Sequence, residues 1–416
     1  DGIGNNADTD DDGDGTSDSN DAFPLDASED TDTDGDGTGD NADTDDDNDG
    51  VPDSEDDYPQ DPTRQTDSDS GDTGTDAVFQ AALEDWEQTM VERGTSLGEK
   101  FESASLSNLN SLPRSWYYDS QRVFFQIAEY LGDPNGKWTG YARAAERAYE
   151  SYIQPNYSMP GYERFPHGLK MDYLRQGDSN SRTTLRNLRD EGPFSNVLTY
   201  QWADGWYEQA SSREIAYMVE THVMAERAGM PRQAEALEAY VDRALTHIEI
   251  WTTGNYITDD PDWQFVQSFM TGLTASALIS YYELTVDKGD PDERIPDAIQ
   301  SMADWLIANT WVPNHDLNGT YSDIPEEYGS FRYVVPATSG VGGDAPAPDL
   351  NLLIAPMFGW LYQHTGDLRY REVGDKAFAG GVAFAYLVPD KAFNQNYRTS
   401  FDYVEWRREG DNKWGN

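Results

Sequence analysis

The feature that most constrains this 416-residue chain is a set of three aspartate-rich stretches, which start at Asp10, Asp32 and Asp45. Each stretch has acidic side chains at positions 1, 3, 5, 9 and 12 and a glycine at position 6. Calcium loops use this spacing, because the carboxylates collect around one cation and the glycine permits a sharp turn. The sequence therefore predicts calcium as a structural cofactor. The predicted ligands are Asp10, Asp12, Asp14, Asp18, Asp21, Asp32, Asp34, Asp36, Asp40, Asp43, Asp45, Asp47, Asp49, Asp53 and Asp56.

The charge is distributed unevenly along the chain. The formal net charge is −49, and up to Asp76 there are 29 acidic residues against one basic residue, Arg64. Such a segment repels itself and has little apolar surface to bury, so it folds only when cations supply the free energy. The alternative is a disordered acidic linker. The strong negative charge argues against nucleic acid as a partner.

The loop starts are 22 and 13 residues apart, and Ala22-Phe-Pro-Leu-Asp26 and Asp57-Tyr-Pro-Gln-Asp-Pro62 occupy the longer spacers. This alternation over residues 1–62 resembles thrombospondin type 3 repeats in a cysteine-free, bacterial form. The resemblance implies a chain wrapped around rows of calcium ions. The opening residues fit the second half of a further loop that ends at Asp8, which predicts that the protein extends beyond residue 1.

Calcium loops of this kind belong to extracellular proteins, where calcium is millimolar. We therefore expect a secreted or cell-surface protein. The chain has no cysteine, so disulfides are not part of its design. No apolar run reaches the length of a transmembrane span.

Beyond the repeats, a Ser/Thr/Gly-rich linker is predicted at residues 63–77, followed by a helical domain at 78–416. Five apolar helix pairs are expected at about 117–153, 167–190, 212–250, 266–309 and 350–386, each joined by a tight turn with a glycine. The 79–107 region can supply a sixth pair. Unequal hairpin lengths favour an (α/α) toroid over a regular solenoid. The pattern resembles the toroids of glycoside hydrolases and polysaccharide lyases at the level of fold only.

If the tight turns lie on one rim of the toroid, the long connections and the starts of the first helices lie on the other. Aromatic rings on that rim suit the apolar faces of sugars, although each ring alone is as well explained by packing. The predicted glycan-binding residues are Tyr200, Trp202, Trp206 and Trp263. The C-terminal tail from Asn394 either closes the bowl or contacts a neighbouring molecule.

Two chemistries fit this rim. A uronate lyase needs a base and groups that neutralise the carboxylate. The candidates are His167, Tyr118, Tyr200, Tyr217, Arg122, Arg213 and Asn351. A hydrolase needs two carboxyl groups across the scissile bond, about 6.5–9.5 Å apart for inversion. The candidates are Asp119, Asp204, Glu214, Asp259, Asp260 and Asp349, and the sequence does not select a pair.

The leading hypothesis is a secreted protein whose toroid acts on or binds extracellular polysaccharide. The alternative is a non-catalytic structural or adhesive protein that self-assembles through its calcium-loaded repeats.

Overall fold

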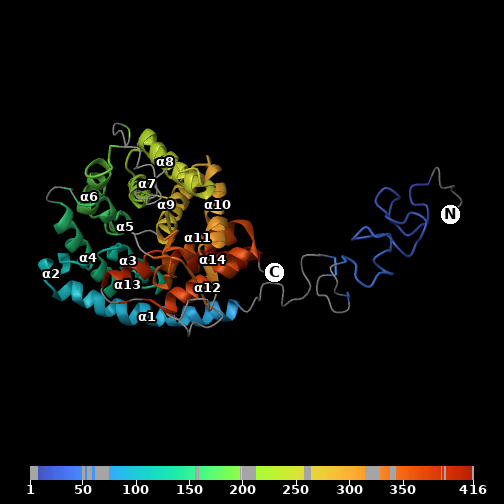
Figure 1. Cartoon of the computed structure of the whole chain (residues 1–416), viewed down its shortest axis with the longest axis horizontal. Helices are drawn as coiled ribbons and strands as arrows, with labels where there is room; N and C mark the ends of the chain where they lie inside the picture. The colour runs from blue at the N-terminus through green and yellow to red at the C-terminus, as the bar shows by residue number, and fades with distance from the viewer. Residues whose placement is uncertain are drawn as a thin grey trace. The chain divides into compact units, whose positions relative to one another are not determined.

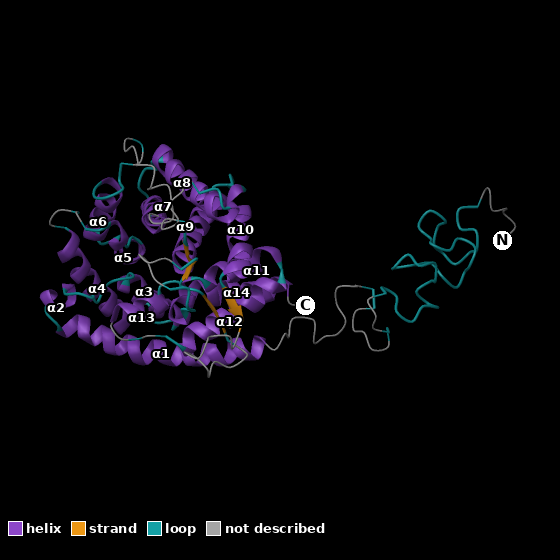
Figure 2. Cartoon of the chain, viewed as in Figure 1, coloured by secondary structure: helices purple, strands orange, loops and turns teal. Residues whose placement is uncertain are grey.

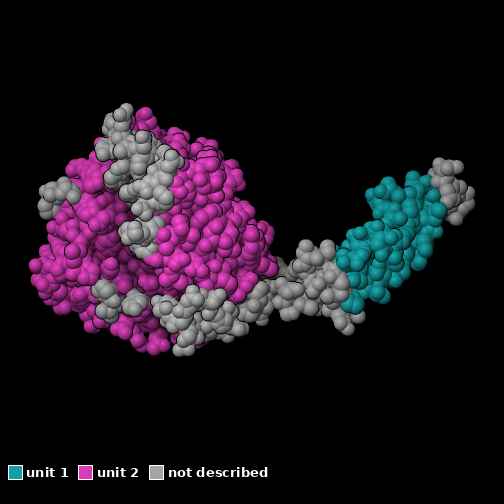
Figure 3. All heavy atoms as spheres, viewed as in Figure 1, with its two compact units in different colours: residues 1–76, 415–416 teal, residues 77–414 magenta. Residues whose placement is uncertain are grey.

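The computed structural model describes residues 8–48, 52–53, 59–60, 75–154, 157, 159–196, 198, 212–256, 264–313, 328–337, 343–385, 387 and 390–414. The chain divides into two compact units. Unit 1 consists of residues 1–76 with 415–416, and unit 2 of residues 77–414 (Figure 3).

Before helix α1 (Thr75–Ser103) begins, the described residues of unit 1 form loops and turns. Residues 8–48 contain neither helix nor strand (Figure 2). Its first described loop closes where the backbone N–H of Asp18 donates to the carbonyl of Thr9, and the second where Asp40 donates to Thr31, both at 3.0 Å. The third closes in the same way, from Asp53 to Thr44 at 2.9 Å. Short-range hydrogen bonds of this kind, and not an apolar core, define the unit.

Unit 2 is mainly α-helical, as the sequence predicts, and contains five consecutive helical hairpins (Figure 1). The pairs are α3 (Ser120–Tyr130) with α4 (Lys137–Ile153), α5 (His167–Gln176) with α6 (Ser179–Asp190), α7 (Ser212–Arg227) with α8 (Ala234–Thr253), α9 (Ser268–Asp287) with α10 (Arg294–Asn309), and α11 (Ala355–Thr365) with α12 (Leu368–Ala383). Most ends of these pairs lie within three residues of the expected ends, because the apolar period and the turn glycines mark where helices stop.

A glycine stands in the turn of every hairpin. Gly132, Gly177, Gly229, Gly289 and Gly366 all have φ between 66° and 79°. This left-handed conformation is unfavourable for residues with a Cβ atom, and it ends the first helix of each pair.

The ends of unit 2 pack together through three further helices. They are α1 (Thr75–Ser103), α13 (Asp390–Tyr397) and α14 (Ser400–Trp414), with the short α2 (Leu106–Asn110) after α1. The ring centroid of Trp86 in α1 lies 5.3 Å from that of Tyr397 and 4.8 Å from that of Phe401. The Nε1–H of Trp86 donates to the hydroxyl of Ser400. The tail is therefore an integral part of unit 2. Helix α1 begins three residues before the expected start at Val78, with Asp76 in its first turn, where a carboxylate favours the helix dipole.

The first helices of the hairpins pack against one another in order. Helix α3 contacts α5, α5 contacts α7, α7 contacts α9, and α9 contacts α11. The order then continues through α14 and α13 back to α3. The second helices lie against the first, as α4 does on α3 and α12 on α11. Packing thus returns to its starting helix.

Short strands and two 3-10 helices complete the described part of unit 2. Strand β1 (Val266–Gln267) pairs antiparallel with β4 (Val334–Val335), and β2 (Trp311–Pro313) pairs with β3 (Gly329–Phe331). The 3-10 helices are η1 (Gly161–Glu163) and η5 (Pro348–Leu353). The strands fasten long connections onto the starts of α9 and η5.

Candidate functional site

The three aspartate loops of unit 1 share one hydrogen bond, and the first two loops share a second. In each loop the carboxylate at position 9 accepts the backbone N–H of position 2: Asp18 from Asp11, Asp40 from Thr33, and Asp53 from Asp46, at 2.8–2.9 Å. The first carboxylate of a loop accepts the N–H of position 4, as Asp10 does from Gly13 and Asp32 from Gly35, both at 2.9 Å. The first two loops therefore have the same local structure as well as the same spacing, while in the third the N–H of Asn48 donates to the backbone carbonyl of Asp45 at 3.1 Å.

Position 4 of each loop has a left-handed backbone. Gly13 and Gly35 have φ of 76° and 77°, and Asn48 has φ of 57° in the third loop. Asparagine is one of the few residues other than glycine that visits this region routinely. The glycines at position 6, Gly15 and Gly37, also have positive φ. The sequence analysis identified position 6 and missed position 4, which the shared Gly/Asn usage marks.

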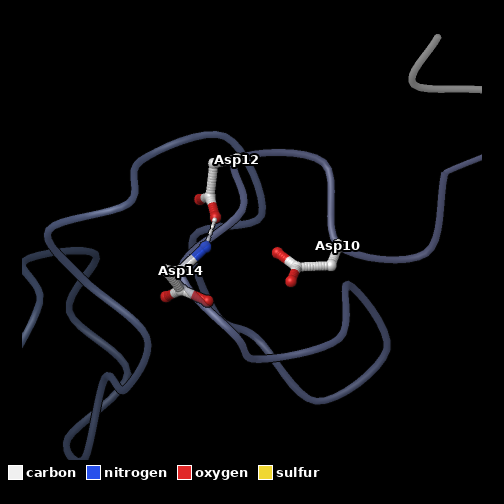
Figure 4. Close-up of side chains that lie close together, drawn as sticks. All are labelled: Asp10, Asp12 and Asp14. Carbon is white, nitrogen blue, oxygen red and sulfur yellow. Dashed lines mark hydrogen bonds between the residues drawn. The ribbon is translucent and has the colours of Figure 1, made fainter. Parts of the chain in front are cut away.

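The carboxylates at positions 1, 3 and 5 converge in the first two loops. One oxygen from each of Asp10, Asp12 and Asp14 lies within 4.8 Å of the others, and the same holds for Asp32, Asp34 and Asp36. Figure 4 shows Asp10, Asp12 and Asp14 around one space, with the N–H of Asp14 donating to Asp12 at 3.2 Å. Oxygen triads of this kind can hold a hard cation.

Other observations fit a cation in these loops. The Oδ2 atoms of Asp12 and Asp21 are buried and have no hydrogen-bond partner among the described residues. Burial, together with the charges of Asp14, Asp21 and Asp10, raises the pKa of Asp12. Crowded acceptors without donors are the chemistry of a cation site. Of the predicted third-loop ligands, Asp49 and Asp56 lie outside the described residues.

In unit 2, the candidate residues gather at the starts of α3, α5 and α7. Tyr118 and Asp119 precede α3 with φ of 67° and 65°. Two consecutive non-glycine residues in this region are strained and persist only where the surroundings hold them. The Asp119 carboxylate holds them here, because it accepts the N–H groups of Arg122 at 3.1 Å and of Gly168 at 3.2 Å.

Gly168 allows this contact between the starts of α3 and α5. A Cβ atom at Gly168 would lie 2.7 Å from Oδ1 of Asp119 and 2.8 Å from the backbone nitrogen of Arg122. The close approach places His167, the first residue of α5, beside the start of α3.

His167 begins a chain of buried polar contacts. Its Nε2 lies 3.7 Å from Oε1 of Glu220, and Arg398 donates to Oε2 of the same carboxylate at 2.6 Å. Arg398 also donates to the hydroxyl of Tyr217 at 2.8 Å. Helix α7 supplies Tyr217 and Glu220 one turn apart, and the link between α13 and α14 supplies Arg398.

The charges along this chain are set by burial and pairing. Burial opposes the ionised form of Glu220, but Arg398, followed by His167, lowers its pKa to about 2. Burial lowers the pKa of His167 to about 3, and Arg122 adds to the effect while Glu220 opposes it. His167 is therefore a neutral imidazole beside an ionised carboxylate at neutral pH, and its low pKa makes it a weak base in this buried state.

Tyrosines and Arg213 complete the cluster. Burial raises the pKa of Tyr118, as does Tyr217, while Arg213 and Arg398 act in the opposite direction. Arg213 pairs with the carboxylate of Glu214 at 2.9 Å and lies over the ring of Tyr162. Tyr118 thus stays a neutral phenol within the electrostatic field of two arginines.

Not all predicted residues belong to this cluster. Arg122 turns to Asp402, with which it forms an ion pair at 2.8 Å. Asn351 is fully buried in η5, where its amide donates to the carbonyls of Gly329 and Ala377 at 2.9 and 3.0 Å. Both of its donor hydrogens are therefore used to fasten β3 and α12. The predicted sugar-binding residues lie outside the described residues: Tyr200, Trp202, Trp206 and Trp263.

The sequence analysis missed Glu220 and Arg398. Glu220 lies three residues after Tyr217, on the same face of α7, and this spacing was its available signal. Arg398 lies in the tail, and nothing in its local sequence indicates that it is fully buried.

One face of unit 2 is hollowed in Figure 3, in the part of the view where Figure 1 draws α3 and α5.

Comparison of the chain with protein-family models, with curated proteins and with solved structures found no match. Within the described residues, every helix is too short or too polar to cross a membrane.

Proposed function

We propose that this chain is a secreted or cell-surface protein in which calcium-loaded repeats carry an (α/α) toroid that cleaves extracellular polysaccharide by a lyase reaction. The observation that carries the proposal is the contact chain His167–Glu220–Arg398–Tyr217, with Tyr118 and Arg213 beside it.

The toroid interpretation is supported by the order of helix packing. The first helices of successive hairpins contact one another, and α14 and α13 connect α11 back to α3. Their N-terminal ends carry Tyr118, His167 and Arg213. In a closed ring these ends share one rim, where long connections also converge. A rigid helical scaffold with functional loops on one rim is a common arrangement for enzymes.

A lyase removes the C5 proton of a uronate residue and expels the 4-linked oxygen. In the proposed mechanism neutral His167 accepts the proton, and Glu220 stabilises the imidazolium that forms. Tyr118, kept protonated, donates its hydroxyl proton to the leaving oxygen. Arg213 pairs with the uronate carboxylate and stabilises the enolate-like charge. The C5–H and C4–O bonds break, and a C4–C5 double bond forms.

The carboxylates of the cluster fit hydrolysis less well. Asp119 accepts two backbone N–H groups, Glu214 pairs with Arg213, and Glu220 pairs with Arg398. A hydrolase needs one carboxyl group free to donate and a second facing it. Of the other hydrolase candidates, Asp204, Asp259 and Asp260 lie outside the described residues.

The test is incubation of the full chain, with calcium, with a panel of uronate-containing and neutral polysaccharides. Ultraviolet absorbance detects the unsaturated lyase product, and a reducing-end assay detects any cleavage. We expect absorbance and reducing ends to rise together. The His167→Ala and Tyr118→Phe variants should each lose about 10²–10⁴-fold in rate. His364→Gln, beside the tight turn of α11, should retain the activity.

The other outcomes are informative. Reducing ends without absorbance would replace the lyase by a hydrolase. No product from any glycan would favour the non-catalytic structural or adhesive alternative, for which the three calcium loops are the supporting feature.

A further inference from the structure

A second acidic cluster lies in unit 2, away from the repeats. Glu146 of α4, Asp172 of α5 and Asp178 at the N-cap of α6 each place a carboxylate oxygen within 4.8 Å of the other two. Glu146 and Asp172 are buried, and the Asp178 side chain is 27% exposed. Three helices of two adjacent hairpins thus direct carboxylates at one point.

One buried oxygen atom of this cluster has no hydrogen bond within the described residues. Asp172 is fully buried, yet its Oδ1 has no hydrogen-bond partner among the described residues. A buried acceptor in this state is costly unless something else binds it.

The Ser181 hydroxyl lies against two carboxylates at once. Its Oγ contacts Oε1 of Glu146 and lies 2.9 Å from Oδ2 of Asp172. A hydroxyl has one hydrogen, so it can donate to only one of them. The second contact brings two oxygen atoms together without a proton, unless one of the carboxyl groups is protonated or a cation binds both.

The described cations do not balance the acids. Arg143 is the ion-pair partner of the cluster within the described residues, and its nitrogens lie 3.9 Å from Asp172 and 3.6 Å from Asp178. Its side chain is 49% exposed, so solvent weakens both contacts. Glu150, one turn along α4, adds a further carboxylate, which accepts from Thr184 at 2.7 Å.

We propose that Glu146, Asp172, Asp178 and Ser181 bind a calcium ion that joins α4, α5 and α6. The donors are all oxygen atoms, as hard divalent cations require. Calcium–oxygen distances of about 2.3–2.6 Å place opposite ligands about 4.6–5.2 Å apart and neighbouring ligands closer, so oxygen atoms within 4.8 Å of one another can share one calcium ion. Water completes the coordination on the exposed side of Asp178.

This site can be measured separately from the repeats. All 12 tryptophans lie at or after Trp86, so tryptophan fluorescence reports the unfolding of unit 2 alone. The experiment compares thermal unfolding of the full chain by tryptophan fluorescence in EDTA, in saturating calcium and in magnesium. We expect calcium to raise the Tm of unit 2 by about 3–5 °C, with a smaller shift in magnesium.

Two variants at the site and two controls locate the ion. Glu146→Gln and Asp178→Asn should abolish the calcium-induced shift, and Asp178→Asn is the milder change because Asp178 is partly exposed. Asp242→Asn, which removes an exposed carboxylate of α8, should keep the shift. The double variant Asp12→Asn/Asp34→Asn should also keep it, because it alters only the repeats. Equilibrium dialysis should find one calcium ion fewer in Asp178→Asn than in the wild-type chain.

The proposal is overturned if calcium leaves the Tm of unit 2 unchanged, or if the double variant in the repeats removes the shift. An unchanged calcium count in Asp178→Asn would also overturn it. A further outcome would show that the carboxylates share a proton and hold no ion. In it, calcium does not change the Tm of the wild-type chain, and Glu146→Gln in EDTA has the same Tm as the wild-type chain in calcium.

Discussion

The two units manage buried negative charge in different ways. In unit 1, carboxylates face carboxylates around shared spaces, and neither a basic side chain nor an apolar core is near the described loops. In unit 2, buried acids mostly face arginines, as in the Glu220–Arg398, Glu163–Arg114 and Asp375–Arg407 pairs. The converging carboxylates of unit 1 need an external cation, whereas the buried acids of unit 2 are neutralised by arginine side chains of the same chain. Stability should therefore depend mainly on calcium in unit 1 and mainly on side-chain pairing in unit 2, where the proposed calcium site adds a smaller contribution.

Chelation should produce the largest contrast between the units. In EDTA, we expect residues 1–62 to expand and become sensitive to protease, because their carboxylates repel one another without cations. The helical circular dichroism signal at room temperature should persist, since unit 2 has an extensive apolar core. Limited proteolysis with mass spectrometry measures the cleavage sites. Equal protection of residues 1–62 with and without calcium would refute the calcium prediction.

Breaking an internal ion pair should affect unit 2 next most strongly. Arg407 donates to Asp375 at 2.9 Å, both groups are fully buried, and Tyr403 donates to the same carboxylate. Asp375→Asn removes the buried carboxylate that faces Arg407 and leaves this arginine its pair with the partly exposed Asp411, so it should cost about 3 kcal/mol in the free energy of unfolding. Denaturant titration followed by tryptophan fluorescence measures it.

The matched control lies on the same helix. Glu372→Gln removes the exposed pair with Lys376, which should cost less than about 1 kcal/mol. Similar costs for Asp375→Asn and Glu372→Gln would show that burial does not govern these pairs.

A pH titration should sharpen the contrast at a smaller scale. His247 on α8 is buried without a hydrogen-bond partner for either ring nitrogen among the described residues, and burial, then Arg243, lowers its pKa to about 3. An unfolded histidine titrates near about 6.5, so between pH 6.5 and 3 the unfolded chain binds a proton that the folded chain rejects. Stability should fall as the pH falls through this window.

The size of this effect is bounded by one proton. His247 should contribute up to about 1.4 kcal/mol per pH unit to the slope of unfolding free energy against pH. His247→Phe keeps an aromatic ring without a titrating group and should reduce the slope, measured by denaturant titrations across the window. An identical slope in both proteins would mean that His247 does not carry the proton uptake.

How much of this could be predicted from sequence also differs between the units. The spacing was sufficient to predict that the aspartates of the first two loops converge, because they lie within 12 residues of one another. It was also sufficient to predict the hairpins, because Gly132 and Gly366 mark turns locally. The partners in unit 2 are distant in sequence: Arg398 meets Glu220 across 178 residues. Local periodicity carries no information about such pairs. It also did not reveal that Asn351 would be used to fasten β3 and α12.

The smallest expected effect tests the backbone of the calcium loops. Position 4 is left-handed in all three loops, and it is occupied by Gly13, Gly35 and Asn48. A Cβ atom at Gly35 would meet no other atom within 4 Å, so any loss in Gly35→Ala comes from backbone conformation and not from a clash. That conformation costs a residue with a Cβ atom about 1–2 kcal/mol, equal to about a 5–30-fold loss in calcium affinity of the second loop.

Asn48→Gly should change the affinity of the third loop by less than about threefold and in the direction of tighter binding, because asparagine already tolerates this region. Calcium titration by isothermal calorimetry measures both variants, and an equal loss in the two would show that the left-handed turn does not limit how these loops close around their ion.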